Sequence, residues 1–101
     1  MYVSRLTFHT IPGKTGEAEA ALKKLQEMVA SAGGPKTRIL HTHFASLGAP
    51  DIVFEQEAED LAGFEAQLHK LTNNKAFQNW SKKMSPLLRE SPKRELYLVA
   101  Q

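Results

Sequence analysis

The feature that most constrains this chain is a run of apolar residues at helical spacing between residues 18 and 32. They recur every three or four positions, which places them on one face of an amphipathic helix: Ala18, Ala21, Leu22, Leu25, Met28, Val29 and Ala32. Gly33-Gly34-Pro35 follows directly. Glycine tolerates the left-handed cap conformation and proline cannot continue a helix, so this tripeptide predicts the helix end.

Four other segments have the alternation or the β-forming composition of strands. They cover residues 2–9, 36–46, 52–57 and 95–99. Residues 47–50, Leu-Gly-Ala-Pro, form a short connection between the second and third of these segments. A connection this short favours an antiparallel hairpin.

A second helical region is expected between residues 60 and 90. Asp60 is a suitable N-cap, and the helix that follows it carries Leu61, Phe64, Leu68 and Leu71. Thr72-Asn73-Asn74 is expected to interrupt the pattern. The apolar stripe then continues towards Ser91-Pro92 through Phe77, Trp80, Met84, Leu87 and Leu88.

The resulting order, strand–helix–strand–strand–helix–strand, predicts the α+β class. It corresponds to a ferredoxin-like βαββαβ antiparallel sheet with both helices on one face, because right-handed crossovers place them on the same side. The 101 residues are enough for one core but not for two. We therefore expect residues 1–101 to form a single α+β domain.

Composition excludes several classes of protein. No apolar run approaches the roughly 20 residues of a membrane span, and the N-terminus shows no basic region followed by an apolar stretch, so no secretory signal is expected. The absence of cysteine excludes disulfides, thiolate catalysis and cysteine-based zinc sites. These observations favour a cytoplasmic location and no membrane partner.

Alternation along the strands divides the sheet residues between two faces. The face expected to lie against the helices carries Leu6, Phe8, Leu40, Phe44, Ile52, Phe54, Leu96 and Leu98. The opposite face carries Val3, Arg5, Thr7, His9, Ile39, His41, His43, Val53, Glu55, Glu57, Glu95, Tyr97 and Val99. This second face carries too many apolar residues for an ordinary solvent-exposed surface and too many charged residues for a core. It predicts a symmetric sheet-on-sheet contact, with interface residues Arg5, His41, His43, Glu55, Glu57 and Tyr97.

A register for the central hairpin follows from placing Phe44 opposite Phe54. The same register sets His43 opposite Glu55 and His41 opposite Glu57. Directly opposed side chains interact, and a carboxylate favours the charged form of a neighbouring imidazole. We therefore expect one or both histidines to titrate above their free values.

The element order and several short motifs resemble the dimeric α+β barrel superfamily, and in particular the antibiotic-biosynthesis-monooxygenase domain. The motifs are Phe8-His9 at the end of the first strand, Gly33-Gly34-Pro35, Lys75–Trp80 and Ser85-Pro86-Leu87-Leu88. The resemblance implies a homodimer whose two sheets form a barrel, with a small-molecule pocket between the sheet and helices of each subunit. It also implies a cofactor-independent monooxygenase-like enzyme acting on a small organic substrate, with no cofactor.

Within that family, haem-degrading members use an Asn on the first strand with a Trp and a His on the helices. This chain has Trp80, but Thr7 or His9 stands where the Asn is needed, and His69 is out of step with the apolar stripe. Haem degradation is therefore not expected.

The residues proposed for a small-molecule site surround the space between sheet and helices. Substrate-binding candidates are Phe44, Phe54, Phe64, Phe77 and Trp80, although a tryptophan on such a stripe more often fills a core. His9, at a strand end near the pocket mouth, is the acid–base candidate, although an exposed terminal histidine is the commoner reading. A cavity of roughly 300 Å³ or more would favour a small-molecule function. A packed interior would favour the alternative, a non-catalytic ligand-binding or interaction module.

Two further functions receive little support. His41-x-His43 with Glu55 or Glu57 could hold a metal ion, but two histidines at even spacing are a weak signal, and no metal is expected. RNA-binding domains share the element order but stack bases on aromatic residues of the open face. Here the equivalent positions include Glu55 and Glu57, whose carboxylates would repel phosphate, so no nucleic-acid partner is expected.

Overall fold

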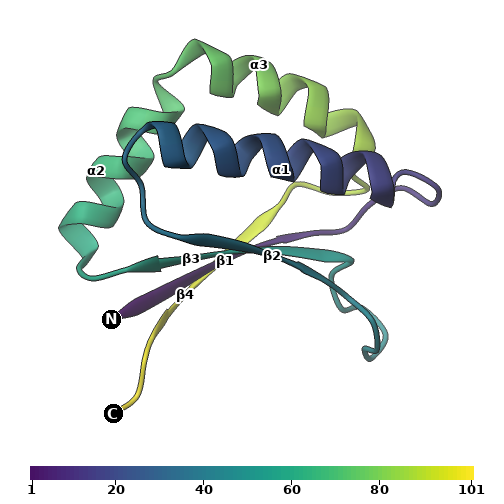
Figure 1. Cartoon of the computed structure of the whole chain (residues 1–101). Coiled ribbons are helices and arrows are strands. Elements are labelled where there is room, and N and C mark those ends of the chain that lie inside the picture. Colours follow the sequence, from purple (N-terminus) through teal and green to yellow (C-terminus); the bar gives the residue numbers. More distant parts are fainter.

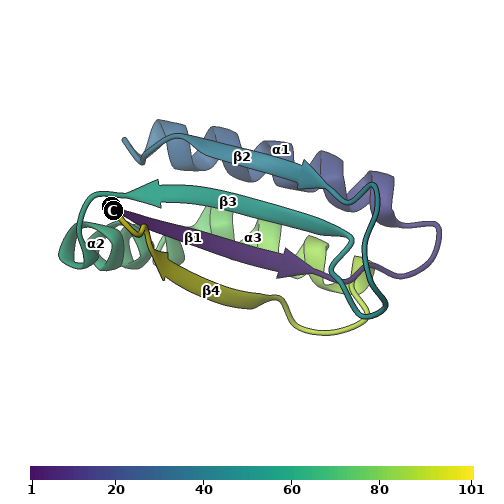
Figure 2. The ribbon, with the colours of Figure 1, turned by 90° about the horizontal axis from the view of Figure 1, so that it is seen from below.

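The computed structural model describes residues 1–101 as one four-stranded sheet covered on one side by helices (Figure 1). The elements are β1 (Tyr2–Phe8), α1 (Thr15–Ser31), β2 (Thr37–His41), β3 (Ile52–Ala58), α2 (Leu61–Thr72), α3 (Lys75–Met84), the 3₁₀ turn η1 (Ser85–Leu87) and β4 (Lys93–Leu98). The strand order is β2-β3-β1-β4 and every pair is antiparallel (Figure 2). The predicted α+β fold with a ferredoxin-like order is confirmed.

Helix α1 ends where Gly33-Gly34-Pro35 predicted it would. Gly33 has a φ of 76°, the left-handed conformation that glycine adopts without steric cost. Its N–H donates to the carbonyl of Ala30, and the N–H of Gly34 donates to the carbonyl of Val29 at 2.9 Å. These bonds satisfy carbonyl groups that the end of a helix would otherwise leave without partners.

The second helical region is two helices because side chains cap each start. Asp60 Oδ1 accepts a hydrogen bond from the N–H of Gly63 at 2.6 Å, as expected of an N-cap. After the break at Asn73, Asn74 Oδ1 accepts from the N–H of Ala76 at 2.7 Å and begins α3. No helix is both long and apolar enough to cross a membrane.

The core lies between the sheet and the helices. Its buried members are Phe8, Ala18, Leu22, Leu25, Val29, Ile52, Phe54, Leu71 and Met84. The apolar stripe of α1 supplies four of them, so the helix packs on the sheet through the face that the sequence predicts.

The expected hairpin register is wrong. Phe54 lies opposite Ile39 and Glu55 opposite Arg38, so the pairs Phe44–Phe54, His43–Glu55 and His41–Glu57 do not form. Strand β2 ends at His41, and residues 42–51 form a longer loop than the short connection suggested. The loop is closed by Thr42, whose Oγ1 donates to the carbonyl of Pro50 at 2.6 Å.

A strand shifted by one residue turns every side chain to the other face of the sheet. Ile39 therefore packs on the core, while Leu40 lies on the open face and Phe44 is 89% exposed in the loop. His41 lies on the helix side, where its Nδ1 is 2.9 Å from Oε1 of Glu19. The placement of Leu40 and Phe44 against the helices was wrong, and so was that of Ile39 and His41 on the open face.

Candidate functional site

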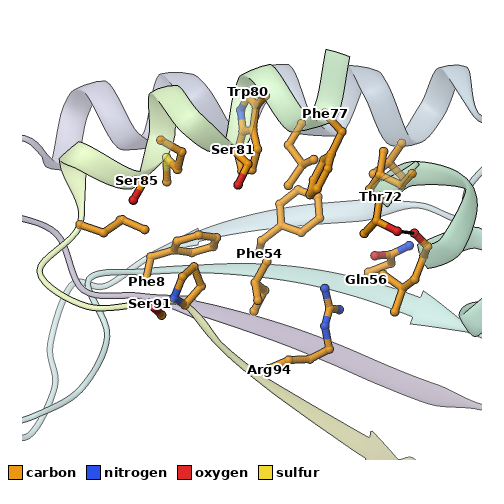
Figure 3. A pocket seen from close by; sticks show the side chains of 18 of the residues that line it. Phe8, Phe54, Gln56, Thr72, Phe77, Trp80, Ser81, Ser85, Ser91 and Arg94 are labelled. Atoms are coloured by element: carbon orange, nitrogen blue, oxygen red, sulfur yellow. Dashed lines mark hydrogen bonds between the residues drawn. The ribbon is translucent and has the colours of Figure 1, made fainter. Parts of the chain in front are cut away.

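A cavity of about 470 Å³ lies between the sheet and helices α2 and α3 (Figure 3). Aromatic rings form much of its wall because alternate residues of the strands and one stripe of α3 point into the same space. Phe8 and Phe54 come from β1 and β3, and Phe77 and Trp80 come from α3. The cavity is large enough for a small organic molecule.

The position of Trp80 is fixed by two contacts. Its Nε1 donates a hydrogen bond to the carbonyl of Ala21 in α1 at 2.7 Å. Its ring stacks on Phe77 with centroids 5.6 Å apart and planes 26° apart. The N–H of the indole is therefore hydrogen-bonded to α1, outside the cavity, and Trp80 presents an apolar ring surface to the cavity.

Polar side chains of the lining come from both the sheet and the helices (Figure 3). Gln56, from β3, donates through Nε2 to Oε1 of Gln67 at 2.5 Å. Thr72 donates to the carbonyl of Leu68 at 2.9 Å. Other polar members of the lining are Ser81, Ser85, Glu90, Ser91 and Arg94.

Arg94 is the cation of this lining. It lies opposite Leu6 of β1, so its side chain is on the helix side of the sheet (Figure 3). Nη1 donates to Oγ of Ser4 at 2.5 Å, and the guanidinium carbon is 5.4 Å from the centroid of the Phe64 ring. Partial burial lowers the pKa of Arg94, because a low-dielectric surrounding disfavours the charged form.

The structure brings some of the predicted substrate-binding residues together and separates others. Phe54, Phe77 and Trp80 line the cavity. Phe64 is buried beside it, beneath the guanidinium of Arg94, and Phe44 lies outside it in the exposed loop. Contact of any of these residues with a ligand stays a prediction.

His9 lies next to the cavity but is not part of its lining. Its Nδ1 is 3.0 Å from Oε1 of Glu90, and its Nε2 is 3.1 Å from the carbonyl of Gly48. Glu90 itself lines the cavity. His9 can therefore influence a bound molecule through Glu90, and its acid–base role stays a prediction.

The open face of the sheet, seen in Figure 2, carries a row of alternating charges across all four strands. The register sets Arg38, Glu55, Arg5 and Glu95 side by side. Oε1 of Glu55 accepts from Nε of Arg5 at 3.0 Å, and Oε2 accepts from Nε and Nη2 of Arg38. The hydrogen bond from Arg38 is the largest of the effects that lower the pKa of Glu55.

Tyr97 lies in the same region of the open face. Its hydroxyl donates to Oε2 of Glu95 at 2.6 Å, and this bond raises the pKa of Tyr97. The guanidinium carbon of Arg5 lies 5.7 Å from the centroid of the Tyr97 ring.

Six residues were expected at an interface on the open face. Four of them, Arg5, Glu55, Glu57 and Tyr97, lie on this face. His41 lies on the other side of the sheet, and His43 is in the loop beside Phe44.

Comparison with known proteins supports the fold assignment. No family model and no curated protein matches the chain. A NIPSNAP domain protein from Burkholderia xenovorans, described as uncharacterized, is 18% identical with a TM-score of 0.79, over 99% of this chain and 95% of that one. A structure described as an antibiotic biosynthesis monooxygenase gives a TM-score of 0.70 at 14% identity over 100% of both chains. The chain has the antibiotic-biosynthesis-monooxygenase fold.

A further structure with this fold is a variant of SnoaB, described as a cofactor-independent oxygenase from Streptomyces nogalater. It is 17% identical with a TM-score of 0.66, over 99% of this chain and 91% of that one. The resemblance inferred from the sequence is therefore confirmed at the level of the monooxygenase fold.

The structure also bears on the metal alternative. Glu55 is on the open face and His41 on the helix side, so these two groups cannot ligate one ion. No three His, Asp or Glu side chains lie close enough together to hold a metal ion. The alternative of a His41–His43–carboxylate centre thus loses its geometric basis.

Two charged residues of these surfaces were not predicted from the sequence. Arg94 lies before the strand expected at residues 95–99, so it was assigned to no face, whereas β4 begins at Lys93 and sets Arg94 opposite Leu6 on the helix side. Arg38 was missed because the expected phase of the second strand was shifted by one residue.

Proposed function

We propose that the protein binds a small, mainly apolar organic molecule in the cavity between its sheet and helices α2 and α3. The observation that carries this proposal is the cavity of about 470 Å³ with its aromatic walls. Cavities of this size and character accept ligands that bury most of their surface. A nucleic acid or a metal ion would find neither a basic groove nor a ligand cluster here.

A cavity-filling substitution tests this proposal. Ser81→Phe places a ring in the cavity, whereas Lys82→Phe adds the same ring to an exposed neighbour on α3 that is outside the lining. Calorimetric titration with two-ring aromatic compounds should show saturable binding to the unsubstituted protein and to Lys82→Phe, and loss of binding in Ser81→Phe. Failure of every such compound to bind, or equal binding to both variants, would contradict the proposal.

A second candidate function, cofactor-independent oxygenation of the bound molecule, is favoured by the similarity in fold to SnoaB. The overall reaction oxidises the bound substrate and reduces dioxygen. One oxygen atom enters the substrate and the other leaves as water, so the substrate supplies all four electrons. The surrounding apolar wall would exclude bulk water from the reacting atoms.

Oxygen uptake by the protein with a bound compound, and without added metal or flavin, tests this second function. His9 with Glu90 is the titratable pair beside the cavity, so His9→Gln should slow uptake, whereas His69→Gln on exposed α2 should not. Binding without oxygen uptake would favour the non-catalytic module.

We further propose that the protein is a homodimer joined through the open faces of two sheets. Leu40 and Tyr97 are exposed on this face, and the adjoining loop carries the exposed Phe44 and Leu47. The loop extends from the sheet on the side away from the helices (Figure 1). An apolar area of this kind on one side of a sheet favours burial against a second copy. Light scattering at micromolar concentration should report a dimer, and a monomer would contradict the proposal.

A further inference from the structure

The cavity contains a cation that no acidic side chain neutralises. None of the ion pairs in the structure includes Arg94. Glu90 is the acidic residue of the lining, but its two oxygens already face His9 at 3.0 Å and Lys93 at 3.8 Å. The charge of Arg94 is therefore available to a group that enters the cavity.

The protein satisfies little of the hydrogen-bonding capacity of this guanidinium. A guanidinium carries five N–H donors in a planar fork. Arg94 uses one of them, in the hydrogen bond from Nη1 to Oγ of Ser4. The Phe64 ring adds an attraction to its face but no hydrogen bond. Arg94 lies on the edge strand β4 and is exposed, so water meets its remaining donors until an acceptor of a bound molecule replaces that water.

The composition of the lining limits the charge of a matching anion. Arg94 is its only Lys, Arg or His residue. A phosphate monoester, with nearly two negative charges, would leave one charge without a partner in a mainly apolar cavity. A carboxylate carries a single charge and matches the planar fork of a guanidinium with two parallel hydrogen bonds.

We propose that Arg94 binds the carboxylate of the molecule that occupies the cavity, so that the ligand is a monocarboxylic acid with an apolar, ring-containing body. The carboxylate lies on the sheet side, and the apolar body lies against Phe54, Phe77 and Trp80 (Figure 3). This inference rests on the proposed small-molecule function and adds the chemical class of the ligand.

The test compares 2-naphthoate with its neutral isostere 2-naphthamide by calorimetric titration at neutral pH. The unsubstituted protein should bind the acid about tenfold or more tightly than the amide, because charge-assisted hydrogen bonds are stronger than neutral ones. Arg94→Gln should remove most of this preference and leave amide affinity within about threefold. Arg94→Lys should restore part of it, because an ammonium keeps the charge but lacks the planar fork.

Arg89→Gln is the matched control, because Arg89 is exposed and lies outside the cavity lining. It removes the same charge and should leave both affinities unchanged. Equal affinity of the unsubstituted protein for acid and amide would overturn the role of Arg94 while leaving the cavity as a binding site. The comparison of acid and amide needs no variant, so it tests the preference for a carboxylate even if Arg94→Gln fails to fold. Binding of neither compound, together with no effect of Ser81→Phe on any ligand, would overturn the proposed function itself.

Discussion

Nε of Arg38 donates a hydrogen bond to Oε2 of Glu55 at 2.8 Å, across the β2–β3 pair. Glu55 is only 5% exposed although it lies on the open face, because Arg38 and Arg5 cover its carboxylate from either side. The two guanidinium groups themselves reach into solvent. Glu55 thus links three strands through a partly screened charge cluster.

Protonation of Glu55 should cost stability in acid. Its pKa is lower in the folded protein than the ordinary 4.5, mainly through the hydrogen bond from Arg38. The unfolded chain therefore takes up the proton first as the pH falls. The stabilisation by Glu55 is complete above that ordinary value and is lost as the pH falls through the folded value.

Glu55→Gln should lower the free energy of unfolding at neutral pH by about 1 kcal/mol, a modest loss because solvent screens both arginines. It should also flatten the decline of stability as the pH falls below about 5, measured by urea unfolding. Glu59→Gln, at an exposed position without an ion pair, is the control and should change neither. An acid decline as steep in Glu55→Gln as in the unsubstituted protein would contradict the assignment.

Tyr97 should ionise above its ordinary pKa of 10.0, because its hydroxyl donates to Glu95. The chain has two tyrosines, so a Tyr2→Phe background leaves Tyr97 as the only phenol in an ultraviolet titration. Adding Glu95→Gln should lower the titration midpoint. A midpoint that does not move would show that the hydrogen bond does not persist in solution.

Gly34 should not tolerate even a methyl group. A Cβ at this position would lie 2.6 Å from both Cγ1 of Val29 and Nε2 of Gln67, and 2.9 Å from the carbonyl oxygen of Val29. Because a backbone atom cannot move aside cheaply, Gly34→Ala should destabilise the protein by about 1–3 kcal/mol in urea unfolding.

Gly16, in the first turn of α1, is the matched control for Gly34. A Cβ there would meet nothing within 4 Å. Gly16→Ala should leave stability unchanged or raise it by up to about 1 kcal/mol, since alanine loses less backbone entropy in a helix. Equal effects of the two substitutions would contradict the close packing at Gly34.

Leu40 provides a test of the proposed dimer. It is 36% exposed on the open face, and Leu61, at 42%, is similarly exposed at the start of α2 in the helix layer. Leu40→Lys would place a charge in the interface and should raise the dimer dissociation constant by about tenfold or more. Leu61→Lys should leave it unchanged in sedimentation measurements. Equal dissociation constants would place the interface elsewhere.

Much of the fold followed from local chemistry. The stripe of α1, its glycine stop and the Asp60 cap each depend on residues within a few positions of one another, and all three appear as predicted. The same holds for the break before α3, where Asn74 caps its own helix. Such features depend little on the rest of the molecule, so pattern alone identifies them.

The phase of β2 could not be obtained in that way. Ile39 and Leu40 are both apolar, and alternation allows either to face the core. The choice depends on the pairing of Ile39 with Phe54 and on the loop that Thr42 and Pro50 close. The error at His41 has this cause, whereas His43 and Phe44 were misplaced because β2 ends at His41 and they lie in the loop that follows.

The sequence by itself therefore determined the element order, the helix limits and the face of α1 that packs on the sheet, because these depend on short-range spacing of apolar side chains. Only the tertiary structure decided that a cavity remains among Phe54, Phe77 and Trp80, because the same apolar residue types occur in a filled core and in the wall of a cavity. It also decided that Arg94 enters this cavity without a carboxylate partner, a relation that joins the last strand to elements distant in the chain.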